Sequence, residues 1–225
     1  MIQTREQGIE TMLAEIDAEA RITRRMTGRP GIDARIMDVM AKVPRDAFVP
    51  EALRAAAFDN GPLPIGHGQT ISQPFIVALM TDLLAPRPTH RVLEIGTGTG
   101  YQTAVLSLLC DSVYSVDRIA ALSETAAARL ERLGFHNVHI RTGDGHAGWP
   151  EFAPYDRVIV TAAATHIPAA LVDQMRPGGR LVIPVGPPHG PQSLLLVNKD
   201  AAGQSEVRDV LGVAFVPLVA DDERR

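Results

Sequence analysis

Cysteine and aromatic residues are scarce in this chain, and it has no excess of positive charge. Aromatic residues make up 4% of its 225 residues, and Cys110 is the single cysteine. A lone cysteine excludes an intramolecular disulfide, and because Cys110 ends the apolar stretch 104–109, we expect it to be buried in a protein of a reducing compartment. The formal net charge of -4 lacks the basic excess that is typical of nucleic-acid binders, so nucleic acid is not an expected partner.

Long apolar runs are absent as well. No run reaches the length needed to span a membrane, and segment 1–21 is charged every few residues, unlike the apolar core of a signal peptide. We therefore expect a cytoplasmic protein that does not contact membranes. With 45% hydrophobic and 21% charged residues, the composition is that of an ordinary globular protein, and its length suits one compact domain over residues 1–225.

The N-terminal part of the chain predicts helices followed by an irregular segment. Apolar positions at helical spacing predict an amphipathic helix over about 7–25 and a second over Asp33 to Val43, which Pro44 ends. Five prolines and three glycines between Pro44 and Pro74 predict turns and a shaped loop. Residues 1–60 should thus form a mainly helical segment that packs on the main domain.

Short apolar runs then alternate with helical stretches, as in βαβ units. The expected parallel strands are Arg91 to Ile95, Ser112 to Val116, Val138 to Arg141, Arg157 to Thr161 and Arg180 to Val185. The expected helices cover 73–84, 101–109, 119–133 and 168–175. Ser193 to Lys199 and a segment within Val207 to Val216 lack intervening helices, so they should form an antiparallel edge. The fold class is therefore α/β, with a mainly parallel central sheet and N-terminal helices.

A glycine-rich turn joins the first of these strands to a helix. Its residues are Gly96, Thr97, Gly98, Thr99 and Gly100. Glycines permit positive φ and close approach of a ligand to the backbone, and the helix start offers unpaired N–H groups. A dinucleotide fingerprint, GxGxxG, would place glycine at Tyr101, whereas this chain has GxGxG behind an acidic residue. The spacing favours S-adenosyl-L-methionine over NAD.

Three acidic residues adjoin the same edge of the expected sheet. Asp117 closes the next strand and suits the ribose hydroxyls of a cofactor, or else caps the helix from Ile119. Asp144, which precedes Gly145, suits the adenine amine, or else forms a plain Asx turn. Glu94 either organises the glycine turn, approaches the cofactor's ammonium group, or is a buried structural carboxylate. The glycine-rich turn, Asp117 and Asp144 each lie just after a successive strand, so these three features should converge on one crevice.

The segment Pro62 to Pro74, PLPIGHGQTISQP, strongly resembles the signature of the protein-L-isoaspartate O-methyltransferase family. The similarity extends from Asp33 to Leu218 and leaves out the N-terminal helix and the tail Asp221 to Arg225. The resemblance implies a Rossmann-like methyltransferase that uses S-adenosyl-L-methionine. It implies methylation of the free carboxylate of L-isoaspartyl, and also D-aspartyl, residues in damaged proteins and peptides, which starts repair through a succinimide.

The resemblance also assigns site residues. It implies that Gln69, Thr70, Ile71 and Ser72 lie over the cofactor and the target carboxylate, with Ser72 as the active-site serine. From the residues alone, Ser72 is either a hydroxyl on a rigid loop or the N-cap of the helix Gln73 to Leu84. His67, between two glycines, is interpreted as structural. No histidine shows metal-ligand spacing with the cysteine, so no metal is expected.

Two other functions stay open at this point. The first is a related methyltransferase that acts on another peptide carboxylate, a small metabolite or RNA. The second is a cofactor-binding regulator without catalysis. Methylation of an isoaspartyl peptide, compared with that of its aspartyl isomer, distinguishes all three functions.

Overall fold

The computed structural model describes residues 4–188 and 190–219. The sequence tail from Asp221 to Arg225 and the first three residues of the chain lie outside the described residues. Within them, no helix combines the length and the apolar character needed to cross a membrane.

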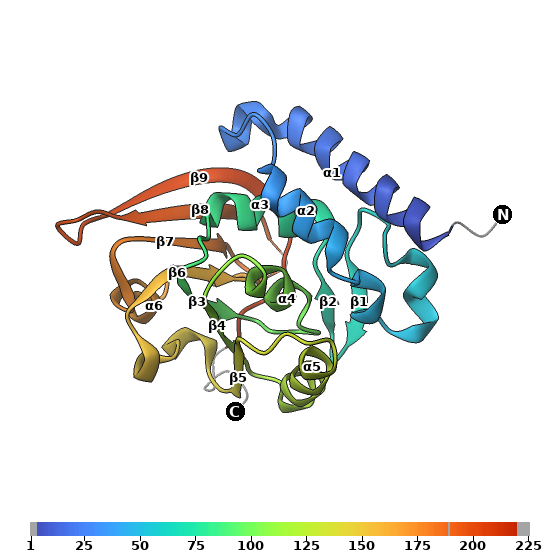
Figure 1. Ribbon diagram of the computed structural model, residues 1–225. Coiled ribbons are helices and arrows are strands. Elements are labelled where there is room, and N and C mark those ends of the chain that lie inside the picture. Colours follow the sequence, from blue (N-terminus) through green and yellow to red (C-terminus); the bar gives the residue numbers. More distant parts are fainter. Residues whose placement is uncertain (1–3, 189, 220–225) are drawn as a thin grey trace.

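A seven-stranded sheet forms the centre of the structure, in the order β5-β4-β3-β6-β7-β8-β9 (Figure 1). The parallel strands are β3 (Arg91–Ile95), β4 (Ser112–Asp117), β5 (Val138–Thr142), β6 (Tyr155–Val160) and β7 (Met175–Val185). The antiparallel edge consists of β8 (Gln192–Lys199) and β9 (Ser205–Val213). This arrangement confirms the expected α/β class, the mainly parallel sheet and the antiparallel edge.

The order of the strands creates a topological switch point at the carboxyl ends of β3 and β6. The chain begins the sheet at β3, moves outward to β4 and β5, and returns to β6 on the other side of β3. In open α/β sheets, ligands bind outside the carboxyl ends of the strands at such a switch point. The ends of β3 and β6, at Ile95 and Val160, are therefore where a ligand is expected.

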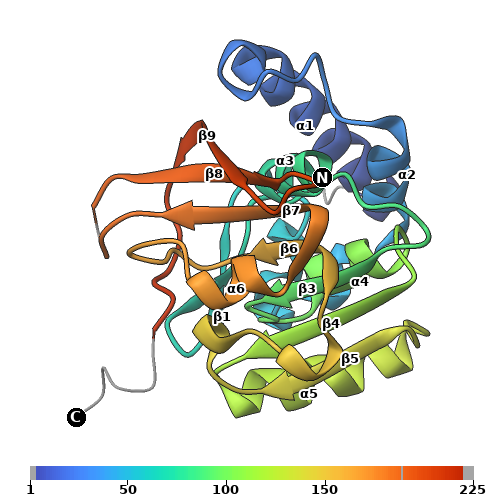
Figure 2. The same cartoon turned by 90° about the vertical axis from the view of Figure 1, so that its left-hand side faces the viewer.

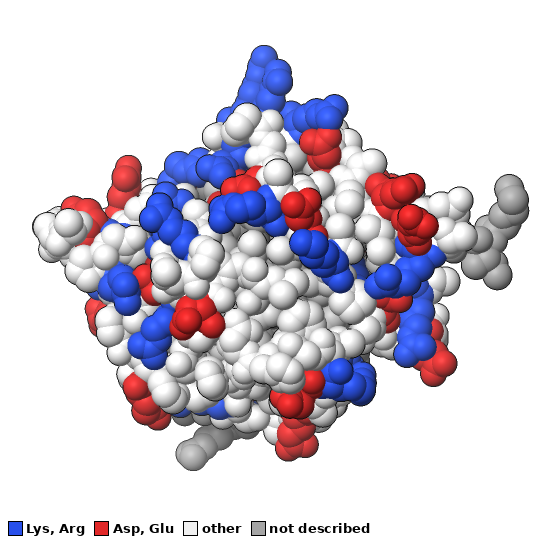
Figure 3. Space-filling view, in the orientation of Figure 1, with Lys and Arg blue, Asp and Glu red and all other residues white. Residues whose placement is uncertain are grey.

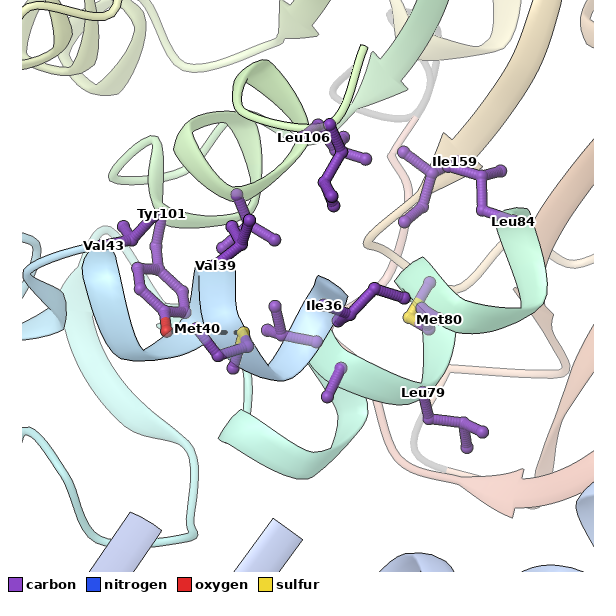
Figure 4. Packing of buried hydrophobic residues seen from close by; sticks show 14 of the residues in the cluster. Ile36, Val39, Met40, Val43, Leu79, Met80, Leu84, Tyr101, Leu106 and Ile159 are labelled. Carbon is purple, nitrogen blue, oxygen red and sulfur yellow. Dashed lines mark hydrogen bonds between the residues drawn. The ribbon is translucent and has the colours of Figure 1, made fainter. Parts of the chain in front are cut away.

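Helices cover both faces of the sheet (Figure 2). They are α1 (Arg5–Thr27), α2 (Ala34–Lys42), α3 (Pro74–Leu84), α4 (Tyr101–Ser107), α5 (Ala120–Arg132) and α6 (Ala169–Asp173). Because neighbouring strand residues point to opposite faces, Val92 joins the core shared with α2, α3 and α4, whereas Leu93 joins the core shared with α6. In the first core, Met40 and Met80 lie between these helices (Figure 4).

The N-terminal helices are fixed by local signals and by packing. Thr4 and Gln7 form a capping box at the start of α1, and Gly28, with φ of 67°, ends the helix. Met12 and Ile16 are fully buried, so α1 lies against the rest of the protein along its apolar stripe. The expected N-terminal helices are confirmed, with α1 slightly longer than the sequence predicts.

The segment Pro44 to Pro74 holds more regular structure than the predicted loop. It contains the short 3₁₀ helices η1 (Arg45–Ala47) and η2 (Glu51–Ala56) and the hairpin of β1 (Leu63–Gly66) with β2 (Gln69–Ile71). His67 and Gly68 form the turn with φ of 54° and 71°, as a two-residue hairpin of type I′ requires. The predicted turns are confirmed at His67 and Gly68, whereas the short strands and 3₁₀ helices were missed because prolines and glycines interrupt their apolar pattern.

Candidate active site

The glycine-rich turn adopts a conformation that other residues strongly disfavour. Gly96, Gly98 and Gly100 have φ of 98°, 54° and 90°. A Cβ atom at Gly96 would lie 2.3 Å from Oγ1 of Thr161, so a side chain would displace the end of β6. Thr161 in turn donates from its hydroxyl to the Gly96 carbonyl oxygen at 2.7 Å. The turn is thus held against the end of β6 in a conformation that suits glycine.

Asp117 holds this turn and the following helix at once. Its Oδ2 accepts from the Gly98 amide at 2.7 Å, and its Oδ1 accepts from the Ile119 amide at 2.8 Å, just before α5. Asp117 therefore binds an amide at the start of α5, as the capping interpretation predicts, although the N-cap position itself is occupied by Ile119. A carboxylate has about four acceptor sites, so Asp117 retains capacity for a ligand.

Glu94 lies inside the protein rather than in a cavity. Its Oε2 accepts from the hydroxyls of Thr103, at 2.5 Å, and Ser115, at 2.6 Å, and Ser115 also contacts the Thr97 hydroxyl at 2.6 Å. Burial raises the pKa of Glu94 to about 7, and Oε1 has no hydrogen-bond partner among the described residues. Glu94 therefore supports the turn through Ser115 and Thr97.

A cavity of about 400 Å³ opens where β3 and β4 end, and we call it the strand-end cavity. Its lining includes Ile95, Gly96, Asp117, Gly145, Gln69, His67 and Leu218. Asp144 is not among the lining residues, because its Oδ1 accepts from the His146 amide at 2.9 Å as an Asx turn. A Cβ at Gly145 would lie 2.4 Å from Cγ2 of Ile95, so this position too is restricted to glycine.

A second cavity, of about 610 Å³, lies on the other side of Ser72, and we call it the large cleft. It is lined by Ser72, Thr70, Gln73, Thr161, Glu19, Thr23, Gln192 and the segment 211–215, among others. Gln192 fixes that segment, since its amide donates to the Phe215 carbonyl at 3.1 Å and accepts from the Phe215 amide at 2.7 Å. Val213, Ala214 and Phe215 line the large cleft together with Pro62 and Thr70, and Leu218 lines the strand-end cavity.

A narrow gap of about 40 Å³ lies between the two cavities. It shares Gly96 with the strand-end cavity and shares Thr70, Ser72 and Thr161 with the large cleft. Thr99 also lines the gap, and its buried hydroxyl has no partner among the described residues. Two molecules that occupy the two cavities would therefore meet beside Ser72 and Gly96.

Ser72 is free of the capping role that the sequence left open. Helix α3 begins at Pro74, its N-cap is Gln73, and no side chain caps it. That alternative was therefore wrong, because Ser72 lies one residue too far from the helix. Within the described residues, the Ser72 hydroxyl makes no hydrogen bond, and the residue is half-buried. Its hydroxyl is available to a ligand in the gap.

Sequence reasoning missed two residues that position the site. Arg45 is fully buried, and its guanidinium donates to the carbonyl oxygens of Ala57, at 2.8 Å, and Ser72, at 2.7 Å. It also lies over the Tyr101 ring, 4.7 Å from the centroid, and burial lowers its pKa. Thr161 was missed too, although its place at the carboxyl end of a predicted strand was a usable signal.

Comparisons with known proteins agree with this geometry. Residues 21–223 match the family model described as protein-L-isoaspartate(D-aspartate) O-methyltransferase. The chain is 57% identical over 207 residues to protein-L-isoaspartate O-methyltransferase 2 of Syntrophobacter fumaroxidans, covering 92% of this chain and 84% of the relative. It is 55% identical to the protein of that name from a Polaromonas species, covering 92% and 98%.

Two solved structures share the fold. One, named protein-L-isoaspartate O-methyltransferase, superposes with a TM-score of 0.80 at 27% identity, covering 95% of this chain and 66% of that one. The other is a Plasmodium falciparum protein described as a putative member of the same kind in complex with S-adenosyl-L-homocysteine, with a TM-score of 0.77, 23% identity and coverage of 93% and 97%. With the family model matched over most of its length, this chain belongs to the protein-L-isoaspartate(D-aspartate) O-methyltransferase family.

Proposed function

We propose that this protein transfers a methyl group from S-adenosyl-L-methionine to the free carboxylate of L-isoaspartyl and D-aspartyl residues in damaged proteins. The observation that carries the proposal is the narrow gap, where Ser72 and Gly96 separate a strand-end cavity from a larger cleft. This division suits a small cofactor on one side and a peptide on the other. Family membership supplies the acceptor chemistry.

The residues around the strand-end cavity fit the cofactor. Gly96 and Gly145 both line this cavity, and the acceptor capacity of Asp117 suits the two ribose hydroxyls. Thr99, whose buried hydroxyl has no hydrogen-bond partner among the described residues, lines the adjoining narrow gap. Bound in the strand-end cavity, S-adenosyl-L-methionine supplies an electrophilic methyl group on a positively charged sulfur.

The acceptor needs positioning rather than activation by a base. An isoaspartyl linkage leaves an α-type carboxylate with a reference pKa of about 3.3 to 3.7, so it is already ionised near neutral pH. Ser72 donates a hydrogen bond to one carboxylate oxygen and points the other toward the gap. Arg45 and Thr161 hold Ser72 and the glycine turn in place through backbone carbonyls. Such positioning is the main catalytic contribution that we assign to the chain.

The walls of the large cleft limit access of water to the acceptor. Segment 211–215, clamped by Gln192, closes one side, and Thr70 on β2 closes another. Opposite charges cancel as a carboxylate reacts with a sulfonium, so a site with little water disfavours the separated ions more than the transition state. The following backbone amide nitrogen then attacks the carbonyl carbon of the methyl ester, and methanol leaves as the succinimide ring closes.

A pair of isomeric peptides tests this function. Purified protein is incubated with S-adenosyl-L-methionine and a peptide that carries either an L-isoaspartyl or an ordinary aspartyl linkage. We expect one methyl group on the isoaspartyl peptide alone, followed by a succinimide and a mixture of both linkages, as seen by mass spectrometry after chromatographic separation. Equal methylation of the two isomers would falsify the repair assignment, and cofactor binding without any transfer would favour a regulator.

We also propose a cytoplasmic location and protein substrates rather than nucleic acid. A chain with one cysteine, Cys110, has no intramolecular disulfide and so does not depend on an oxidising compartment. Burial raises the pKa of the Cys110 thiol to about 12, which makes it a poor nucleophile. Positive and negative side chains are interspersed on the face in Figure 3 instead of forming a continuous basic surface. Such a surface offers little general attraction for a phosphate backbone.

A further inference from the structure

Helix α1 contributes a wall of the large cleft, although most of it precedes the part of the chain that matches the family model. The match begins at residue 21, whereas Glu19 lies before it. Glu19 and Thr23 are four residues apart and therefore share one helix face, and both line the cleft that Ser72 also lines. Figure 1 places α1 on the outside of the molecule, near α3 and β9. The N-terminal helix thus reaches the acceptor side of the site.

The Glu19 carboxylate is held in a fixed position. Its Oε2 accepts from the side-chain amides of Asn60, at 2.8 Å, and Gln73, at 2.9 Å. Asn60 is itself anchored, because its Oδ1 accepts from the Phe75 amide at 3.0 Å. Since Gln73 directly follows Ser72 in the chain, the carboxylate is tied to the segment that carries the active-site hydroxyl.

Among the described residues, no cation is paired with the charge of Glu19. Both groups that bind Oε2 are neutral amides, and within the described part of the chain Oε1 receives no hydrogen bond and no cation pairs with the carboxylate. Among the described residues that line the large cleft, Glu19 is the single ionisable side chain. The residue is half-buried, so solvent screens this charge less than it would on an open surface.

We propose that Glu19 is a specificity-determining residue that selects acceptor peptides with a lysine or arginine side chain close to the isoaspartyl residue and disfavours acidic neighbours. This inference rests on the proposed function, since it assigns the large cleft to the peptide. A flexible cationic side chain can reach the free Oε1, whereas an aspartate or glutamate of the substrate is repelled.

The test compares acceptor peptides that differ in one flanking charge. Isoaspartyl hexapeptides carry lysine, alanine or glutamate at one position within two residues on either side, and kcat/KM is measured for wild type and Glu19→Gln. Glutamine keeps an oxygen that can accept from Asn60 and Gln73, so the variant removes charge with little change in shape. Glu10→Gln, at an exposed position on the same helix, is the matched control for net charge.

We expect the wild type to prefer the lysine peptide over the glutamate peptide at one position or more, and Glu19→Gln to shrink that ratio by about three- to tenfold. Glu10→Gln should leave the ratio unchanged. Because the interaction is electrostatic, the wild-type ratio should also contract as ionic strength rises from about 0.02 M to 0.5 M, a measurement that needs no variant.

Several results would overturn the assignment. A wild type that treats the three flanking residues alike at low salt refutes it, as does a Glu19→Gln enzyme that loses activity equally on all peptides, which is the signature of a structural role alone. Absence of methylation on every isoaspartyl peptide refutes the proposed function itself, so the two failures are distinguishable.

Discussion

Glu94 gives the most quantitative prediction, because its environment favours the protonated form of a carboxyl group. It is fully buried, its pKa is raised to about 7 by burial, and its Oε1 has no hydrogen-bond partner among the described residues. The unfolded chain has the ordinary value, near 4.5. The folded protein therefore binds more protons than the unfolded chain between these two pKa values.

The sign and size of the effect follow from this difference. The stabilising contribution of Glu94 is fully present below about pH 4.5 and is lost as the pH rises through about 7. A shift of this size corresponds to roughly 3 kcal/mol, of which between about 2 and 3 kcal/mol falls between pH 5 and pH 8. Replacement by glutamine keeps an acceptor for Thr103 and Ser115 and removes the titration.

The assay is urea unfolding of wild type and Glu94→Gln at several values between about pH 5 and pH 8. Contributions from other groups cancel in the difference between the two proteins. We expect the free energy of unfolding of the variant, relative to the wild type, to rise by about 2 kcal/mol over this range. Parallel pH profiles would show that Glu94 does not titrate there, and the account of its burial would be refuted.

The remaining predictions concern the cofactor and the acceptor. Asp117→Ala should weaken S-adenosyl-L-methionine binding by about 1 to 3 kcal/mol in calorimetry, with no NAD binding by either protein, and an unchanged affinity would leave Asp117 a structural role only. Ser72→Ala should lower turnover much more than cofactor affinity, without the loss of stability that follows removal of a helix cap; normal turnover would remove Ser72 from the mechanism. Arg45→Met leaves two carbonyls without a donor and should cost about 2 kcal/mol or more in urea unfolding. Unchanged stability would contradict the role of Arg45 in holding the backbone at Ala57 and Ser72.

The parts of the fold that depend on local pattern were predictable from the sequence. The apolar run Arg91 to Ile95 is strand β3 without change, and the helix expected from Tyr101 is α4. Closely spaced glycines after a strand indicate a turn with positive φ, so the turn 96–100 could be recognised from the sequence alone. These features are determined within a few residues of the chain.

The parts that depend on distant contacts were not predictable. The order of β7, β8 and β9 is set by pairing across the sheet, and β7 begins at Met175, earlier than its apolar run indicates. Arg45 reads as a surface residue, yet it is buried by contacts with Ala57, Ser72 and Tyr101. A hydrogen bond from a side chain to a backbone carbonyl far away in the chain produces no recognisable pattern in the sequence.

Asp117 shows why structural and binding interpretations need not compete at such a site. The sequence offered a helix cap or a ribose ligand, and the carboxylate already holds both the glycine turn and the amide before α5. Since about four acceptor sites are present and two are used, a ligand can share the group without releasing either bond. The loss of cofactor affinity in Asp117→Ala therefore has two contributions, the lost contact with the cofactor and the lost support of the glycine turn. The free energy of unfolding of the same variant measures the second contribution.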